Sequence, residues 1–333
     1  LVNPYFPNKK LIDEMQANFQ TLLTQYPSGM HINSLIAAKN FGLKEPQIIV
    51  GNGAAELIKS LMEGLTGKIG VLHPSFEEYA NRRKPEDLVP FVCQNPDYTY
   101  TADELMEFYD KTDIKNLLIV NPDNPSGNYI PKADVIRLIA WAKQRSIKLV
   151  IDESFVDFVD MEENTTLLEQ SLLNSNPHLY VVKSISKSYG VPGLRLGILA
   201  SGDAEAIATM KKDVAIWNIN SFAEFYMQIY EKYKSAYAEG LTRFYQTRKK
   251  FIEDLAEISF LRVIPSQANY VLCEITKDYT STELTTILLE DNILIKDLST
   301  KKGFEGKQYV RIAVRDEEDN QMLISALKAL LLK

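Results

Sequence analysis

Short apolar runs alternate with amphipathic stretches from residue 47 to residue 212, and this alternation restricts the folds open to the chain. The apolar runs are QIIV, KIGVL, NLLIV, KLVI, LYVV and RLGILA. The stretches GAAELIKSLMEGL, SFEEYANRR, PKADVIRLIAWAKQR and DAEAIATMKK carry apolar residues at helical spacing. Short apolar runs bounded by loops are typical of strands buried on both faces. The sequence therefore predicts an α/β fold with a mostly parallel central sheet flanked by helices.

The composition and hydrophobic pattern of the sequence change after Trp217. A region rich in Tyr, Lys and Glu continues to about Glu257 and is predicted to be helical. Strand-like runs FLRVI, NYVLCEI, NILIK and QYVRIAV follow, with a final helical stretch DNQMLISALKALL. We expect a second, smaller α+β domain that packs with an N-terminal helix at Lys10 to Thr24. The predicted division is an N-terminal segment 1–45 joining the small domain, a large α/β domain 46–235 and a small C-terminal domain 236–333.

The charge of the chain excludes some classes of partner. Lys and Arg number 37 against 44 Asp and Glu, which gives a formal net charge of −7 spread along the sequence. Nucleic-acid binding needs a basic face, so no nucleic-acid partner is expected. No apolar stretch approaches the roughly 18 residues of a membrane-spanning helix, so no membrane partner is expected either.

The cysteines and the N-terminus bear on the compartment. Cys93 and Cys273 lie in separate apolar runs, which is typical of buried thiols in a reducing compartment, and we predict a cytoplasmic protein. The first residues, LVNPYFPNKK, lack the charged and apolar regions of a signal peptide. Because the chain begins at Leu1 rather than Met, a missing upstream domain stays open. The histidines show no metal-ligand spacing, so no metal site is expected.

Five polar groups follow predicted strands, where open α/β sheets bind their ligands. They are Gly51 to Glu56, His73 to Phe76, Asn121 to Gly127, Asp152 with Glu153, and Ser184 to Gly197. The first group enters a helix, whose free N–H groups and dipole favour a phosphate. The last group combines hydroxyls, glycines and a guanidinium around a lysine, which indicates a bound anion.

Two of these groups also match motifs of other enzyme classes. Gly51-x-Gly53-x-x-Glu56 is similar to a dinucleotide fingerprint, but Glu56 stands where close helix packing needs a small residue. Ser184-x-x-Lys187 matches the serine–lysine motif of penicillin-binding enzymes, yet the chain contains neither S-D-N nor K-T-G. Neither interpretation uses all five groups.

A single cofactor does use all five. Pyridoxal 5′-phosphate needs a phosphate cradle, an aromatic face, a carboxylate that keeps its pyridine nitrogen protonated, and a lysine that forms a Schiff base with its aldehyde. In order and spacing, NPDNPSG, DESFVDF and SxSKxxGxxGxRxG resemble the motifs of fold-type I pyridoxal-phosphate enzymes, the aminotransferase class I/II family. The resemblance covers nearly the whole chain.

The resemblance implies a role for each matching residue. Lys187 would form the Schiff base and move the Cα proton, and it is preferred to Lys183, which lacks the flanking hydroxyls. Asp152 would pair with the pyridine nitrogen, and Asn124 would bind the phenolic oxygen. The other implied cofactor ligands are Phe76 on the ring and Ala54, Ala55, Ser184, Ser186 and Arg195 at the phosphate, with Tyr26 reaching the phosphate from the neighbouring subunit of a homodimer. Arg311, Lys296 and Asn3 are the implied substrate-binding residues.

Within the family the chain resembles histidinol-phosphate aminotransferases and threonine-phosphate decarboxylases, through VNPYFP, QYP, GNGAAELI, WNINSFA and SQANYVL. It departs from the first group at Phe155, where D-E-A-Y is common, and at Lys296, where an arginine follows ILI. We expect amino transfer from a small phosphorylated or anionic amino donor to a keto-acid acceptor. The alternative is decarboxylation of a phosphorylated amino acid, and one half of a bifunctional protein also stays open.

Overall fold

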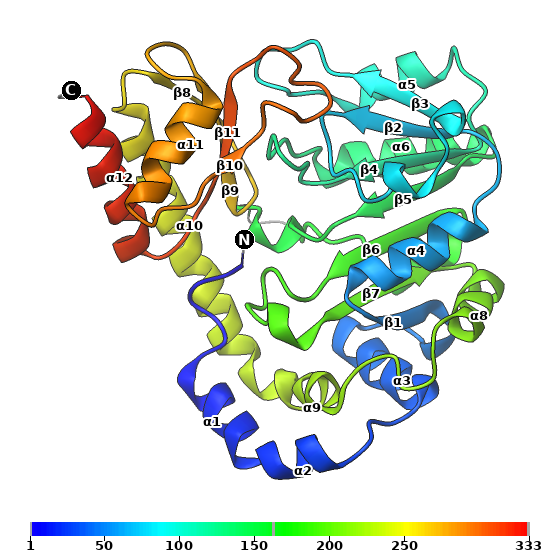
Figure 1. The fold of residues 1–333 in the computed structure, drawn as a ribbon. Coiled ribbons are helices and arrows are strands. Elements are labelled where there is room, and N and C mark those ends of the chain that lie inside the picture. Colours follow the sequence, from blue (N-terminus) through cyan, green and yellow to red (C-terminus); the bar gives the residue numbers. More distant parts are fainter. Residues whose placement is uncertain (1, 162–163, 332–333) are drawn as a thin grey trace.

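A seven-stranded sheet is the main feature of the fold (Figure 1). Among its described strands, β7 alone has the reverse direction and is antiparallel to both of its neighbours, β1 and β6. The structure is a computed structural model and describes residues 2–161 and 164–331. The strands, in spatial order, are β1 (Ile48–Asn52), β7 (Leu196–Ser201), β6 (Leu179–Ser184), β5 (Lys148–Asp152), β4 (Asn116–Val120), β2 (Ile69–His73) and β3 (Leu88–Val92). The predicted α/β fold with a mostly parallel sheet is confirmed.

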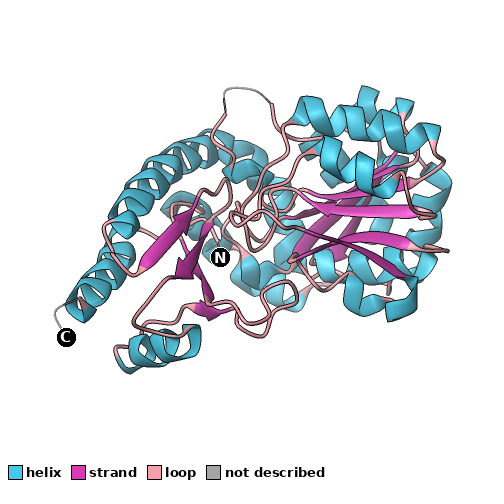
Figure 2. Cartoon of the chain, turned by 90° about the horizontal axis from the view of Figure 1, so that it is seen from above, coloured by secondary structure: helices cyan, strands magenta, loops and turns pink. Residues whose placement is uncertain are grey.

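Helices cover both faces of this large sheet (Figure 2). They are α3 (Met30–Phe41), α4 (Ala54–Gly64), α5 (Ala102–Tyr109), α6 (Lys132–Gln144), α7 (Gln170–Ser175), α8 (Ala204–Asp213) and α9 (Ser221–Ile229). Their ends have local causes. Thr101 and Glu104 form a capping box at the start of α5, and Gly42 ends α3 in the left-handed region with φ 66°.

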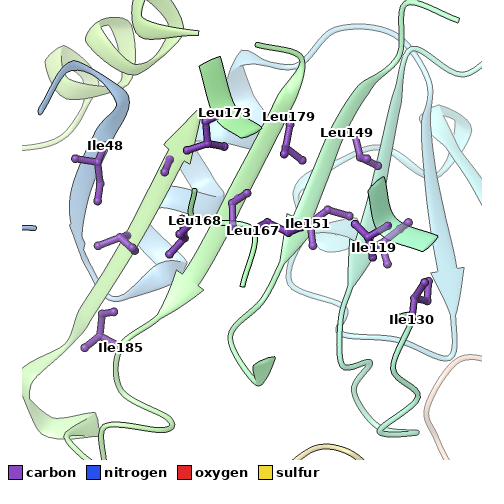
Figure 3. Packing of buried hydrophobic residues seen from close by; sticks show 14 of the residues in the cluster. Ile48, Ile119, Ile130, Leu149, Ile151, Leu167, Leu168, Leu173, Leu179 and Ile185 are labelled. Atoms are coloured by element: carbon purple, nitrogen blue, oxygen red, sulfur yellow. The ribbon is translucent and has the colours of Figure 1, made fainter. Parts of the chain in front are cut away.

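The apolar runs of the sequence become the centre of the core. Ile119, Ile151 and Leu179, from β4, β5 and β6, lie on one face of the sheet, where Leu167 and Leu168 pack over them (Figure 3). All five are buried, and each buried Leu or Ile contributes roughly 1.5–3 kcal/mol by leaving water. The central strands are therefore held rigidly, and so are the residues at their carboxyl ends.

A second, four-stranded antiparallel sheet follows in the C-terminal part (Figure 1). Its strands, in spatial order, are β10 (Lys296–Asp297), β11 (Tyr309–Ala313), β9 (Tyr270–Ile275) and β8 (Leu261–Ile264), and its helices are α10 (Lys234–Ala256), α11 (Ser281–Glu290) and α12 (Glu317–Leu330). This small sheet has its own apolar cluster, which includes Phe251, Val271 and Leu327. No helix among the described residues is long and apolar enough to cross a bilayer.

The N-terminal segment contacts both parts of the molecule. The helix expected at Lys10 to Thr24 is divided into α1 (Lys9–Ala17) and α2 (Phe19–Thr24) at Asn18. Helix α2 contacts α9, and α3 contacts β1 of the large sheet. Tyr5, by contrast, bonds Thr247 of α10 at 2.7 Å. The division at residues 45 and 235 stays a prediction.

Two segments differ from the expected elements. SFEEYANRR was expected to be helical but contains only the 3₁₀ turn Ala80–Arg82, because the buried Tyr79 bonds Asp152 and Arg83 bonds the carbonyl oxygen of Leu65. The strand expected at NILIK is limited to Lys296–Asp297, because Asn292 is left-handed with φ 62° at the end of α11. In both cases neighbouring structure outweighs the local pattern.

Candidate active site

Most of the predicted cofactor ligands line one cavity of about 270 Å³, beyond the carboxyl ends of β4, β5 and β6. The lining residues are Ala54, Ala55, Ile58, Phe76, Val120, Asn124, Asp152, Ser154, Phe155, Ser184, Lys187, Arg195 and Arg311. These residues come from distant parts of the sequence, and the order of the strands in the sheet brings them together.

Lys187 follows β6 and points its ammonium group into this cavity. Its Nζ lies 5.7 Å from the centre of the Phe155 ring, and no ion pair or hydrogen bond to another described residue holds it. Burial lowers the pKa of Lys187; the nearby Arg311 and Arg195 lower it further, while Asp152 opposes them. A lysine with a lowered pKa and no partner is available as a nucleophile and as a base.

Asp152 closes the buried end of the cavity. Its Oδ2 accepts a hydrogen bond of 2.8 Å from the hydroxyl of Tyr79, and its Oδ1 accepts one of 2.9 Å from the backbone N–H of Ser154. Burial raises the pKa of Asp152, although these two bonds and the charge of Lys187 favour the carboxylate. A protonated ring nitrogen beside it would supply the positive charge that this buried carboxylate lacks.

The start of α4 is the predicted phosphate cradle. Gly53 has φ 76°, and a Cβ built on it would lie 2.5 Å from Nη2 of Arg195, so only glycine lets the backbone approach the guanidinium this closely. The backbone N–H groups of Ala54 and Ala55 begin the helix. Glu56 accepts a 2.7 Å bond from the N–H of Asn52, which explains a charged residue at this position.

Asn124 and Arg311 join the large and small sheets at the cavity. Nη1 of Arg311 donates to Oδ1 of Asn124 at 2.6 Å, so the Asn124 amide group remains as a donor toward the cavity. The guanidinium carbon of Arg311 lies 5.3 Å from the centre of the Tyr270 ring. Burial lowers the pKa of Arg311, and its Nε finds no partner among the described residues. Arg311 therefore has donor capacity left for an anion.

Asp123 ties together the two loops that carry Phe76 and Asn124. Its carboxylate accepts a bond of 2.5 Å from Ser75 and one of 2.9 Å from Ser126. Burial raises the pKa of Asp123 to about 6, although both serine bonds favour the charged form.

Four predicted residues do not line the cavity. Ser186 is buried, and its hydroxyl has no partner among the described residues. The backbone N–H of Asn3 donates to the carbonyl oxygen of Lys187 at 2.9 Å; its side-chain oxygen accepts from the N–H of Tyr5 at 2.9 Å, and its Nδ2 is buried without a described partner. Tyr26 is 78% exposed and stacks on Trp217, so a role in a neighbouring subunit stays a prediction. Lys296 is exposed in a separate groove of about 890 Å³ that Arg311 also borders.

Four residues at or near the site were not predicted from the sequence: Tyr79, Ser154, Tyr270 and Asp123. Tyr79 lay in a segment expected to be helical, and Tyr270 lay inside a strand, so neither followed an apolar run. Ser154 and Asp123 had a usable signal, because each stands beside a predicted ligand within its motif.

The fold and the site define a pyridoxal-phosphate enzyme of fold type I. The sequence matches the family described as "Aminotransferase class I and II" over residues 10–327, and the chain belongs to this family. Pyridoxal 5′-phosphate is therefore its cofactor.

The chain is similar to several known proteins. It is 31% identical over 98% of its length to CMP-5'-(3-aminopropyl)phosphonate synthase of Streptomyces rubellomurinus, and it spans 51% of that protein. It is 30% identical over 99% of its length to L-serine phosphate decarboxylase of Sulfurospirillum multivorans and covers 87% of it. The structure of histidinol-phosphate aminotransferase from Clostridium acetobutylicum superposes with a TM-score of 0.86 at 27% identity, covering 99% of this chain and 97% of the other. The chain thus spans about half the length of the first relative.

The cavity fits the cofactor on structural grounds. Among the residues that line the cavity, Arg311 has a buried Nε without a described partner, which leaves a donor for an anion. A Cβ on Gly197 would lie 2.3 Å from the backbone nitrogen of Ala54, so the cradle depends on close backbone approach. Among the described residues, no group of three or more His, Cys, Asp or Glu side chains is arranged to hold a metal ion.

Proposed function

We propose that the chain removes the α-carboxylate from a small amino acid that carries a phosphate or phosphonate group. The bond between the α-carbon and the carboxylate breaks, carbon dioxide leaves, and a proton takes its place at the α-carbon. The product is the corresponding amine. The sequence predicts amino transfer first, but two relatives support decarboxylation. One, matched over 87% of its length, is named for decarboxylation of serine phosphate, and the other, of which this chain spans 51%, is named for synthesis of a CMP-linked aminopropylphosphonate.

The observation that carries the proposal is Phe155. It is 5% exposed, packs edge-on against Tyr270 and faces the ammonium group of Lys187. The resemblance to histidinol-phosphate aminotransferases implies a tyrosine at this position. Phe155 lacks the tyrosine hydroxyl, so this wall of the cavity is apolar. A substrate carboxylate held against this apolar wall would be favoured to leave as carbon dioxide, because the departing group gives up its charge.

Each residue of the cavity has a separate role in the proposed reaction. When bound, pyridoxal 5′-phosphate would supply an aldehyde that can link to an amine and a ring that accepts electrons. Asp152 would keep a proton on the ring nitrogen, and Arg195 with the start of α4 would hold the cofactor phosphate. Arg311 binds one anionic group of the substrate. Lys187 delivers the proton to the α-carbon after carbon dioxide has left.

The test is an assay with O-phospho-L-serine and O-phospho-L-threonine, each without a keto acid. We expect carbon dioxide and the amine phosphate in equal amounts. The Phe155→Tyr variant serves as a matched comparison, since it restores the hydroxyl and changes little else. Absence of carbon dioxide from the wild-type enzyme with both phosphoamino acids would contradict the proposal.

Amino transfer is the second candidate function. The similarity to the C. acetobutylicum aminotransferase over nearly both whole chains favours it. In this case Lys187 removes the Cα proton, and a keto acid must enter the same cavity. Formation of glutamate from 2-oxoglutarate and histidinol phosphate, without carbon dioxide release, would support amino transfer over decarboxylation.

A further inference from the structure

The residue that follows Lys187 is held by a carboxylate from outside the cavity. Asp157 lies in the 3₁₀ turn Val156–Phe158, which follows β5. Its Oδ2 accepts a hydrogen bond of 2.6 Å from the hydroxyl of Ser188, and its Oδ1 accepts one of 2.7 Å from Nζ of Lys183. Ser188 is fully buried, and neither it nor Asp157 lines the cavity. One carboxylate therefore contacts the chain on both sides of Lys187.

The backbone of Lys187 is also fixed at its carbonyl group. This oxygen accepts hydrogen bonds from the N–H groups of Asn3 at 2.9 Å and Gly190 at 3.2 Å. Gly190 has φ 64°, and a Cβ built on it would lie 1.7 Å from the carbonyl oxygen of Phe6, so the N-terminal segment lies directly against the loop. The ammonium group of Lys187, by contrast, forms no ion pair or hydrogen bond with another described residue. The position of its Nζ therefore depends on how the backbone on both sides is held.

Pairing with Lys183 alone does not account for the contact of Asp157 with Ser188. Neutralising the charge of Lys183 needs only one oxygen of Asp157, and Glu153 lies 3.7 Å from the same Nζ. The other oxygen of Asp157 accepts the bond from Ser188, which is charge-assisted and therefore roughly twice as strong as a bond between neutral groups. The carboxylate thus joins the loop after Lys187 to the strand before it.

We propose that Asp157 is a positioning residue for Lys187: through Ser188 it holds the loop so that Nζ of Lys187 reaches the reacting atoms in the cavity. Position matters because a displacement of about 1 Å in a reacting group can lower a rate about 100-fold. The inference goes beyond the proposed function, because Lys187 has a role in both candidate reactions.

The first measurement needs no substrate. The full chain, freed of cofactor, is mixed with pyridoxal 5′-phosphate. Visible absorbance then follows the bond that Nζ of Lys187 would form with the aldehyde carbon as one water leaves, and the rate reports how well Nζ is placed. The second measurement is kcat and KM with the best substrate found. Misplacement of Lys187 lowers kcat, whereas loss of substrate binding raises KM.

Three variants and a control separate the carboxylate contact from general packing. Ser188→Ala removes the hydroxyl and leaves the ion pair of Asp157 with Lys183. Asp157→Asn keeps the shape and removes the charge, and the double variant shows whether the two residues act through one contact, because such effects are not additive. Tyr245→Phe is the matched control: it removes a 2.8 Å hydrogen bond to the backbone carbonyl oxygen of Asp157 and leaves both contacts of the carboxylate.

We expect Ser188→Ala and Asp157→Asn each to slow cofactor attachment and to lower kcat by about 10- to 100-fold, with KM changed by less than about 3-fold. The double variant should be no more than about 3-fold slower than the slower single variant, and Tyr245→Phe should stay within about 3-fold of the wild type. If Asp157→Asn has a lowered melting temperature, Ser188→Ala decides, because it keeps the ion pair with Lys183.

Three results would overturn the inference. They are attachment in Ser188→Ala at the wild-type rate, a double variant whose loss is the product of the two single losses, and a Tyr245→Phe variant as slow as Ser188→Ala. These outcomes are distinct from failure of the proposed function. Absence of carbon dioxide release would refute decarboxylation, while the attachment rates would still decide the role of Asp157.

Discussion

Two lysines at and just after the end of β6 have opposite surroundings, one fully buried and one partly buried. Lys183 lies inside the strand, with Asp157 at 2.7 Å and Glu153 at 3.7 Å from its Nζ. Burial lowers the pKa of Lys183, but the two carboxylates outweigh it and raise the pKa above its usual value. Lys187 has no such partner, and its pKa is lowered. Burial is common to both, so the placement of carboxylates makes one lysine structural and the other reactive.

Replacing the unpaired lysine is expected to have the largest effect. Lys187→Ala should lower turnover by about 1000-fold or more, because the chain loses its covalent anchor and its proton donor. The measurement is kcat with the best substrate found, beside the melting temperature, which should change little. Turnover near that of the wild type would assign the reaction to another residue.

The carboxylate opposite Lys187 should come next. Asp152→Ala removes the negative charge that keeps the ring nitrogen protonated, and kcat should fall by about 100-fold or more. Tyr79→Phe is the control, since it removes a bond to Asp152 but leaves the charge. A loss of only a few-fold in Asp152→Ala would mean that another group holds the ring nitrogen.

The role of Lys183, the lysine with two carboxylate partners, is tested by the free energy of unfolding. Lys183→Met leaves Glu153 and Asp157 without their cation, and the free energy of unfolding should fall by about 3–5 kcal/mol. Urea denaturation measures this change. Lys148→Met, at the exposed start of β5, is the control and should change stability by less than about 1 kcal/mol. Equal stability of the two variants would show that the ion pairs of Lys183 contribute nothing to the free energy of unfolding.

The comparison of paired and unpaired buried charges also applies to a carboxylate. Asp123 is buried, and no described lysine lies within salt-bridge distance of it. Its pKa of about 6 lies above the ordinary aspartate value of about 3.9. The folded chain therefore binds more protons than the unfolded chain between about pH 4 and 6. Its free energy of unfolding should decrease by up to about 3 kcal/mol as the pH rises through this interval.

Asp123→Asn should abolish that part of the pH dependence. The measurement is the difference in free energy of unfolding between variant and wild type at pH 4.5 and at pH 7. Asp13→Asn, at an exposed position on α1, is the control. A difference that is the same at both pH values would show that Asp123 is already ionised at pH 4.5 in the folded chain.

The sequence predicted the part of the site that follows from strand order. Lys187, Asp152 and Asn124 each lie in the loop that follows an apolar run, and parallel strands bring their carboxyl ends together. Tyr79 and Tyr270 could not be predicted in this way. Their roles depend on where a turn and a strand of the small sheet lie in space, which local periodicity does not encode.

The reversed direction of β7 has a consequence for how such enzymes diversify. Because β7 is antiparallel to β6, the chain returns without a crossover helix, and Lys187 and Arg195 share one short connection. The spacing between the predicted Schiff-base lysine and the predicted phosphate-binding arginine is therefore set within one loop, and displacement of the small sheet leaves it unchanged. Arg311, the predicted substrate-binding arginine, lies by contrast on β11 of the small sheet. Substitutions in the small sheet can therefore change substrate binding while the predicted cofactor ligands stay in place.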